Sequence, residues 1–251
     1  NYVRNSCGFF DVSHMGRLVI NIDEIDNISK LICSDIINLD NSKALYTIFT
    51  NKNGKSLDDV IFWKFEEKLV LICNASNRDK ISKHLTNNGI KFDDQTFDTC
   101  LIAIQGPDSE KLMNNLLDLP DRFSAIDNDD YIYARTGYTG EDGFEIMFNN
   151  SKLNEVLKYI IDKNINPCGL GSRDTLRLEA SLPLYGFELS EEISPIEANL
   201  KWVLTNKEDY LGKDKIEDEL NNGNHKILKK FVINSKKIAR TGTKVKNNNI
   251  N

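Results

Sequence analysis

The sequence lacks any long apolar segment, since no run approaches the roughly 20 residues that a membrane-spanning helix requires. Of its 251 residues, 40% are hydrophobic and 28% are charged, which is close to the average for globular proteins. This composition argues against a membrane protein. The length predicts one large soluble domain or two smaller ones, each with its own hydrophobic core.

An excess of basic residues is also absent. The formal net charge is −6, and the 32 lysines and arginines are scattered along the whole chain. Nucleic-acid-binding proteins usually concentrate positive charge on one face, so binding to a polyanion is disfavoured.

Histidine is scarce, and His14, His84 and His225 lie far apart, none at metal-ligand spacing to a cysteine or another histidine. No metal site is therefore predicted. The five cysteines are an odd number at wide spacings, which predicts buried, reduced thiols rather than a disulfide framework. The chain begins with Asn1 and has no signal-like segment, so we expect it to be trimmed or processed.

The apolar residues alternate between the two-residue period of strands and the 3.6-residue period of helices. Strands are predicted at 18–22, 98–107, 131–136 and 143–148, with three more within 45–76 separated by turns at 53–54 and 66–67. Helices are predicted at 23–36, 76–89, 108–117, 152–162, 171–182 and 213–220, and two short strands within 225–251. Residues 40–120 thus have the order β, β, β, α, β, α, which predicts an α+β fold with antiparallel sheet.

Two adjacent carboxylates, Asp58 and Asp59, lie in the segment GKSLDDVIF. If the strand continues to Trp63, the two side chains point to opposite faces, because side-chain direction alternates along a strand. One carboxylate could then face a cavity, orient an N–H-rich substrate and transfer a proton. Alternatively, both aspartates belong to the turn around Asn53-Gly54.

The segment RTGYTGEDGFEI, residues 135–146, contains three glycines, which suit a strongly bent connection. Alternation places Phe144 and Ile146 on one face of the following strand and Glu145 on the other. A carboxylate there could accept two hydrogen bonds from a planar amidine-like edge, such as that of a pterin. The alternative is a glycine hairpin with solvated acids.

Arg173 lies in the first turn of the helix predicted from GLGSRDTLRLEA. The helix dipole disfavours a cation at this position, which suggests a partner carboxylate from the protein or from a ligand, although a surface Arg–Glu pair is the common alternative. His14 in DVSHMG is interpreted as a structural hydrogen-bonding residue. No Ser, Cys or Thr has a convincing base beside it, so a hydrolase triad is not supported.

Taken together, these segments resemble the aminomethyltransferase family, the T-protein of the glycine cleavage system. The likeness extends to about residue 212, and the joint occurrence of RTGYTGEDGFE with a GLGxRDxLRLEAxLPLYG-like run is highly specific. The matching segments, in the family's order, are FFDVSHMGRLVI, NGKSLDDVI, LVLICNASNRDK, LIAIQGP, ARTGYTGEDGFEI, GLGSRDTLRLEASLPLYGFEL and SPIEANLKWV.

The resemblance implies a reaction. In that family, an aminomethyl group held by sulfur on the lipoyl arm of the H-protein is transferred to tetrahydrofolate, giving 5,10-methylenetetrahydrofolate, ammonia and the reduced lipoyl carrier. Tetrahydrofolate is thus the implied co-substrate and the lipoylated H-protein the implied partner. The implied location is mitochondrial in a eukaryote and cytoplasmic otherwise.

The resemblance also implies roles for residues. Asp59 matches the family's key aspartate near N5 and N10 of the folate, and Glu145 and Arg173 match substrate-binding residues. Asn74, Tyr46 and Trp63 fall where neighbouring segments of such a pocket are expected.

The implied fold is a multi-domain folate-binding T-protein fold. Residues 1–40 with 125–212 would form a discontinuous first folate-binding domain, and 41–124 an inserted ferredoxin-like module. Residues 213–251 would begin a C-terminal β-barrel that is truncated here.

Three alternatives to aminomethyl transfer are considered. Two share the fold: a folate-binding iron–sulfur assembly factor, whose Lys-Gly-Cys-type signature is missing here, and a folate-linked demethylase, which normally carries a flavin domain. The third is a non-catalytic scaffold that only docks a carrier protein.

Overall fold

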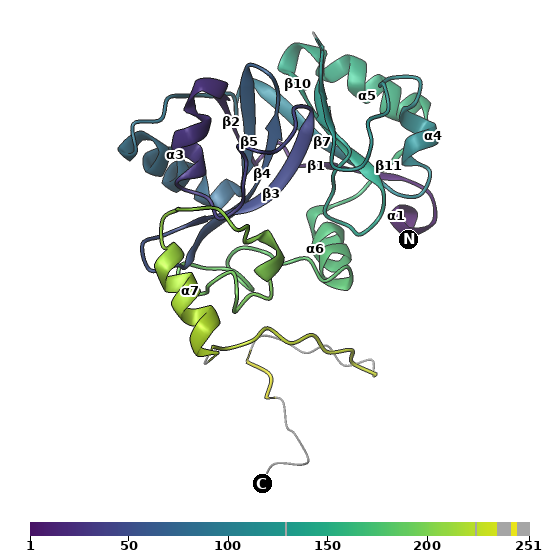
Figure 1. The fold of residues 1–251 in the computed structure, drawn as a ribbon. Coiled ribbons are helices and arrows are strands. Elements are labelled where there is room, and N and C mark those ends of the chain that lie inside the picture. The colour runs from purple at the N-terminus through teal and green to yellow at the C-terminus, as the bar shows by residue number, and fades with distance from the viewer. Residues whose placement is uncertain (129, 224, 235–241, 245–251) are drawn as a thin grey trace.

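The computed structural model describes residues 1–128, 130–223, 225–234 and 242–244. Within them, the strands form two sheets, and helices lie on the outer side of each (Figure 1). The first sheet has the strand order β11 (Asn166–Pro167), β1 (Gly8–Asp11), β7 (Thr99–Gln105), β10 (Gly143–Asn149), β9 (Ile132–Ala134) and β8 (Ala125–Asp127). All its pairs are antiparallel except β1 with β11.

The second sheet is antiparallel throughout. Its strand order is β3 (Lys43–Thr50), β4 (Ser56–Lys64), β5 (Lys68–Cys73), β2 (Gly16–Asn21) and β6 (Phe92–Asp94). The register of β3 and β4 pairs Ile48 with Asp59. The prediction of an α+β fold with antiparallel sheets is confirmed.

The helices are short, and they are α1 (Tyr2–Asn5), α2 (Ile25–Ser29), α3 (Arg78–Asn87), α4 (Ser109–Met113), α5 (Leu153–Asp162), α6 (Leu170–Glu179) and α7 (Lys213–Asn222). Four 3-10 turns, η1 (Ile22–Glu24), η2 (Ala75–Asn77), η3 (Asn150–Lys152) and η4 (Lys201–Val203), complete the regular structure of the described residues. The predicted helix at 23–36 is shorter than expected, because Ile32 leaves the helix to form a β-bridge with Phe49.

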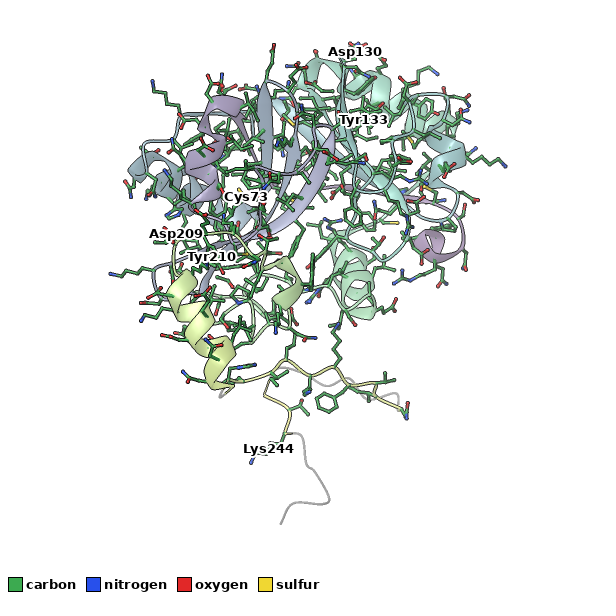
Figure 2. All side chains as sticks on the ribbon, viewed as in Figure 1. Cys73, Asp130, Tyr133, Asp209, Tyr210 and Lys244 are labelled. Carbon is green, nitrogen blue, oxygen red and sulfur yellow. The ribbon has the colours of Figure 1, made fainter. Side chains whose placement is uncertain are left out.

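Three layers of apolar side chains hold the sheets and helices together. One packs α2 and α3 on the second sheet, a second lies between the two sheets, and a third packs α4 and α5 on the first sheet. Figure 2 shows Cys73 within the second sheet and Tyr133 within the first, and both are fully buried. A fourth cluster joins α7 and the segment 189–203 to the second sheet near Ile48.

Strand pairing does not follow the predicted domain boundaries. Strand β7, from the predicted module at 41–124, pairs with β1 and β10 of the other sheet. In its place β2, from the predicted first domain, pairs with β5 and β6. This exchange of strands arises because the chain changes sheets within the four residues between β1 and β2.

Arg17 holds this crossing between the sheets. Its side chain is fully buried and forms no ion pair within the described residues, although the charges of Asp94 and Asp11 act on it. It instead donates to the carbonyls of Ser13, Met15, Thr96 and Thr99 and to the Thr99 hydroxyl. The segment 12–15 is thereby fixed against the segment 96–99.

The last predicted region is only partly confirmed. Helix α7 forms where the charged helix was expected. The described residues of 225–251 contain no strand, and the rest of that segment lies outside the described residues. The two short strands predicted there are therefore not formed within residues 225–234 and 242–244. Leu228 and Lys230 instead contact the folded body through Glu197 and Ser181.

Candidate active site

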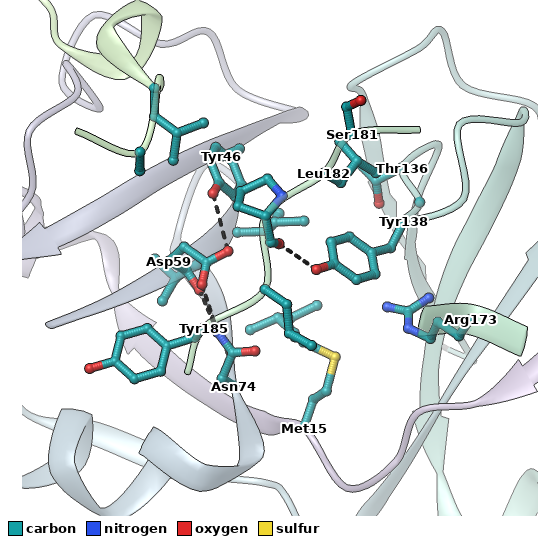
Figure 3. Close-up of a pocket in the computed structure, with 18 of the residues that line it drawn as sticks. Met15, Tyr46, Asp59, Asn74, Thr136, Tyr138, Arg173, Ser181, Leu182 and Tyr185 are labelled. Carbon is teal, nitrogen blue, oxygen red and sulfur yellow. Dashed lines mark hydrogen bonds between the residues drawn. The ribbon is translucent and has the colours of Figure 1, made fainter. Parts of the chain in front are cut away.

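A pocket of about 640 Å³ opens between the two sheets. Its walls come from β3, β4 and the end of β5 on one side, and from β10, α6 and the 136–138 loop on the other (Figure 3). The segments 181–185 and 198–202 complete it, with Leu228 and Lys230. Most of the lining surface is apolar. Its polar side chains include Asp59, Tyr46, Asn74, Thr136, Tyr138, Glu145, Arg173 and His14.

Asp59 faces the pocket from β4, and both of its carboxylate oxygens are held. The Tyr46 hydroxyl donates to one oxygen at 3.1 Å, and the Asn74 side-chain amide donates to the other at 2.9 Å. Burial raises the pKa of Asp59 to about 6, although these hydrogen bonds favour the ionised form. A carboxyl with this pKa can exchange a proton near neutral pH.

Asp58 points away from the pocket, as strand alternation predicted. Its side chain is neither exposed to solvent nor part of the turn. It is fully buried and accepts hydrogen bonds from Asn74 and Asn77. Burial, and secondly the charge of Asp59, raise the pKa of Asp58 to about 7. The interpretation of both acids as turn residues is wrong.

Glu145 and Arg173 form the opposite wall. Glu145 is 4% exposed, and one carboxylate oxygen accepts a hydrogen bond from the Thr136 hydroxyl at 2.7 Å. Its other oxygen lies 3.8 Å from Arg173 Nη2, beyond hydrogen-bond distance. The buried Arg173 Nη1 has no hydrogen-bond partner. The wall thus offers one free acceptor and one free donor to a ligand.

The Arg173 guanidinium also lies over the Tyr138 ring, 4.9 Å from its centroid. Burial lowers the pKa of Arg173, while Glu145 partly offsets that effect. The sequence predicted a carboxylate partner for this arginine, and Glu145 occupies that place at long range.

The glycine-rich connection 135–142 is shaped by Gln105 of β7. The Gln105 amide donates to the Thr136 carbonyl and accepts from the Thr139 hydroxyl. A Cβ on Gly137 would lie 1.9 Å from Gln105 Oε1, and one on Gly143 would lie 2.2 Å from the Ile104 carbonyl oxygen. The connection can approach β7 only because these positions lack side chains.

The acids of this connection are partly buried and paired with arginines. Asp142 pairs with Arg135, and Glu141 pairs with Arg4. These ion pairs hold the bent connection in place. The strand that follows it places Glu145 at the pocket, while Phe144 and Ile146 pack in the third core layer.

Comparison with known proteins identifies the family. The sequence model described as "GCVT N-terminal domain" matches residues 1–208. The chain belongs to this family. Among curated relatives, the aminomethyltransferase of Thermosipho melanesiensis is 38% identical over 97% of this chain and 71% of its own length, and that of Bacillus subtilis is 37% identical over 97% and 73%.

A solved structure of a GCVT-family protein has the same fold. The glycine cleavage system aminomethyltransferase T of Bartonella henselae superposes with a TM-score of 0.81 and 27% identity. The match covers 88% of this chain and 65% of the Bartonella chain. The predicted family, and the prediction of a transferase, are confirmed by these relatives.

In this GCVT-family chain, five of the six predicted site residues line one pocket, namely Asp59, Glu145, Arg173, Asn74 and Tyr46. Trp63 does not line it. It shares a strand face with Asp59 but lies four residues further along β4, where it is fully buried in the layer between the sheets. Its assignment to the pocket is therefore wrong, while the roles of the other five remain predictions.

Sequence reasoning missed several lining residues, among them Met15, Tyr138 and Tyr185. They lie in connections without regular periodicity, so no pattern indicated where their side chains point. His14 was interpreted as a structural hydrogen-bonding residue, and this is wrong, since its ring lines the pocket without a hydrogen bond to any described residue. Partial desolvation and the charge of Arg173 lower its pKa.

Outside this pocket, the described residues offer little other chemistry. They contain no group of three or more His, Cys, Asp or Glu side chains able to hold a metal ion. All five cysteines are free. Cys7, Cys33 and Cys73 are buried, as predicted, whereas Cys100 and Cys168 are partly exposed, contrary to the prediction. Among the same residues, no helix combines the length and apolarity needed to cross a membrane.

Proposed function

We propose that this protein transfers the methylene carbon of an aminomethyl group, carried on the lipoyl arm of the glycine cleavage H-protein, to tetrahydrofolate. The observation that carries the proposal is the placement of Asp59. Its carboxylate is fixed on a rigid strand and lies across the pocket from Arg173 (Figure 3). Glu145, which lies beside Arg173, offers its free oxygen from the same opposite wall. Asp59 on one wall can thus act on a reacting nitrogen of the folate, while Glu145 and Arg173 on the other wall bind its ring system.

The recognition wall suits a folate. The free Glu145 oxygen can accept from the N–H edge of a pterin, and the free Arg173 Nη1 can donate to a ligand oxygen or carboxylate. Apolar side chains such as Met15, Ile61 and Leu182 supply flat surfaces for aromatic rings. The pocket volume of about 640 Å³ lies within the usual range for ligands of this size.

The chemistry requires proton transfers. The C–S and C–N bonds of the aminomethyl group break, two C–N bonds to the folate form, and the protons lost from N5 and N10 end on ammonia and the lipoyl thiol. A pKa of about 6 leaves Asp59 mostly ionised at neutral pH, able to accept a proton from a ring nitrogen and pass it to a leaving group.

Substitution of Asp59 by asparagine tests the proposal. We expect Asp59→Asn to lower the rate of ammonia release from an aminomethyl-lipoyl carrier with tetrahydrofolate by roughly 10²- to 10⁴-fold, the usual contribution of a general acid–base. Asp79→Asn is the matched control, because its side chain is 79% exposed on α3. An unchanged rate in Asp59→Asn would refute the catalytic role.

Binding separates this proposal from its alternatives. A folate-binding protein without transfer activity would bind tetrahydrofolate and release no ammonia, and a carrier-docking scaffold would do neither. The family's compartment, mitochondrial in a eukaryote and cytoplasmic otherwise, is a prediction carried by the resemblance alone. The relatives named above are bacterial.

A further inference from the structure

A second carboxylate lies directly behind Asp59. Asp58 is fully buried and does not line the pocket. It accepts hydrogen bonds from the Asn74 backbone N–H at 3.2 Å, the Asn74 side-chain amide at 2.8 Å and the Asn77 side-chain amide at 2.5 Å. Within the described part of the chain, neither aspartate has a cationic partner.

We infer that Asp58 is a positioning residue that fixes the Asp59 carboxylate through the shared Asn74 amide and couples the protonation of the two carboxyls. The structural part of this inference is independent of the substrate. Its catalytic consequence rests on the proposed function.

The Asn74 amide is the link between the two acids. Its Nδ2 lies 2.8 Å from Asp58 Oδ1, 2.9 Å from Asp59 Oδ1 and 3.1 Å from the Asp59 carbonyl oxygen. Asn74 precedes η2 as its N-cap residue, yet its side chain makes no capping hydrogen bond. The amide is therefore committed to the aspartates, and Asp58 holds it in the orientation that Asp59 needs.

Charge couples the two acids as well. Two adjacent carboxylates without a cation repel each other when both are ionised, so the pair loses its protons in two linked steps. Burial raises the pKa of Asp59 to about 6 and that of Asp58 to about 7, where the charge of Asp59 contributes. Near neutral pH, the protonation state of Asp58 thus determines whether the pair carries one negative charge or two.

The other titratable groups around the pair stay neutral in this range. Their pKa values are raised, primarily by burial, above already high ordinary values. These groups are Cys73 and Tyr185 near Asp58, and Tyr46 and Tyr138 near Asp59. The charged side chains beside these groups include Asp94 and Arg78 at Cys73, and Lys80, which donates a hydrogen bond to the Tyr185 hydroxyl. A titration near neutral pH therefore reports on the two aspartates.

Carboxyl NMR of the ligand-free protein with carbon-13-labelled aspartate tests the coupling. In the wild type, we expect the Asp59 resonance to show two linked transitions between about pH 5 and 8. In Asp58→Asn, it should show one. Identical Asp59 titration in both proteins would overturn the inference, whatever reaction the protein catalyses.

A second variant removes a hydrogen bond to Asp58 without substituting either aspartate. The Asn77 side chain donates to Asp58 and not to Asp59. Asn77→Ala removes one donor from the ionised form, so the upper transition should move to higher pH by about one unit. Asp79→Asn, on the exposed side of α3, should move neither transition. An unmoved upper transition in Asn77→Ala would also overturn the inference, even if Asp58→Asn does not fold.

Kinetics test the catalytic consequence. Asp58→Asn should lower kcat about 10-fold and remove one ionisation from the pH profile, while KM for tetrahydrofolate stays within about twofold because Asp58 does not touch the pocket. A raised KM with unchanged kcat and pH profile would contradict the positioning role. If the wild type releases no ammonia, the proposed function fails, and the NMR titration still decides the coupling.

Discussion

Arg173 is an arginine whose hydrogen-bonding capacity is incompletely used. Its guanidinium is buried beside Glu145 and over Tyr138, yet Nη1 has no partner. An unpaired buried N–H of a charged group costs free energy that a bound acceptor can recover. This side chain therefore makes the empty pocket less favourable and the occupied pocket more favourable.

We expect Arg173→Met to weaken tetrahydrofolate binding roughly 10- to 100-fold, since hydrogen bonds to charged groups contribute about 1.5–3 kcal/mol. Isothermal titration calorimetry measures the loss, with Arg122→Met as the control because its side chain is 67% exposed. Unaltered affinity in Arg173→Met would remove this arginine from the binding site.

At the scale of elements, the connection from β1 to β2 controls the geometry of the pocket. It passes from one sheet to the other and carries His14 and Met15 into the pocket wall. Arg17 anchors it with five side-chain hydrogen bonds, four to backbone carbonyls and one to the Thr99 hydroxyl. The long arginine side chain hydrogen-bonds to residues 13–15 and 96–99 at the same time, which a short polar side chain could not do.

Removing that anchor should cost stability. Arg17→Met leaves the buried carbonyls of Ser13, Met15, Thr96 and Thr99 without this donor, and we expect a loss of about 3 kcal/mol or more. Urea unfolding gives the value, and Lys158→Met provides an exposed control expected within about 0.5 kcal/mol of the wild type. A loss no greater than the control's would show that the crossing is held by other contacts.

At the scale of the whole molecule, the acidic pair makes the stability of the fold depend on pH. The folded pKa of Asp58, about 7, lies above its ordinary value of 3.8, so the folded state binds more protons than the unfolded state between these values. Stability from this group is therefore present at low pH and is lost as the pH rises through about 7. This direction is opposite to that of a salt-bridged aspartate.

The comparison of wild type with Asp58→Asn isolates that effect. From pH 4 to pH 7.5, we expect the wild type to lose about 4 kcal/mol of unfolding free energy relative to the variant, from a shift of about three pKa units. Urea denaturation at several pH values measures it, and the histidines contribute equally to both proteins. Parallel pH curves would show that Asp58 ionises normally.

Local periodicity predicted which side chains share a face of a single strand. It placed Asp58 and Asp59 on opposite faces, and separated Glu145 from Phe144 and Ile146. The same pattern could not show that β1 and β2 belong to different sheets, because that depends on contacts between distant segments. It also could not separate Asp59 from Trp63, since both share a face and only packing between the sheets distinguishes the pocket from the core.

The two tryptophans occupy opposite environments. Trp63 is fully buried between the sheets, whereas Trp202 is 67% exposed, lines the pocket and stacks on Tyr46 with ring centroids 5.5 Å apart. Since the sequence has only these two, intrinsic fluorescence contains one solvent-sensitive signal at the pocket and one shielded signal in the interior. Occupancy of the pocket can therefore be followed optically without a label, with Trp63 as the internal reference.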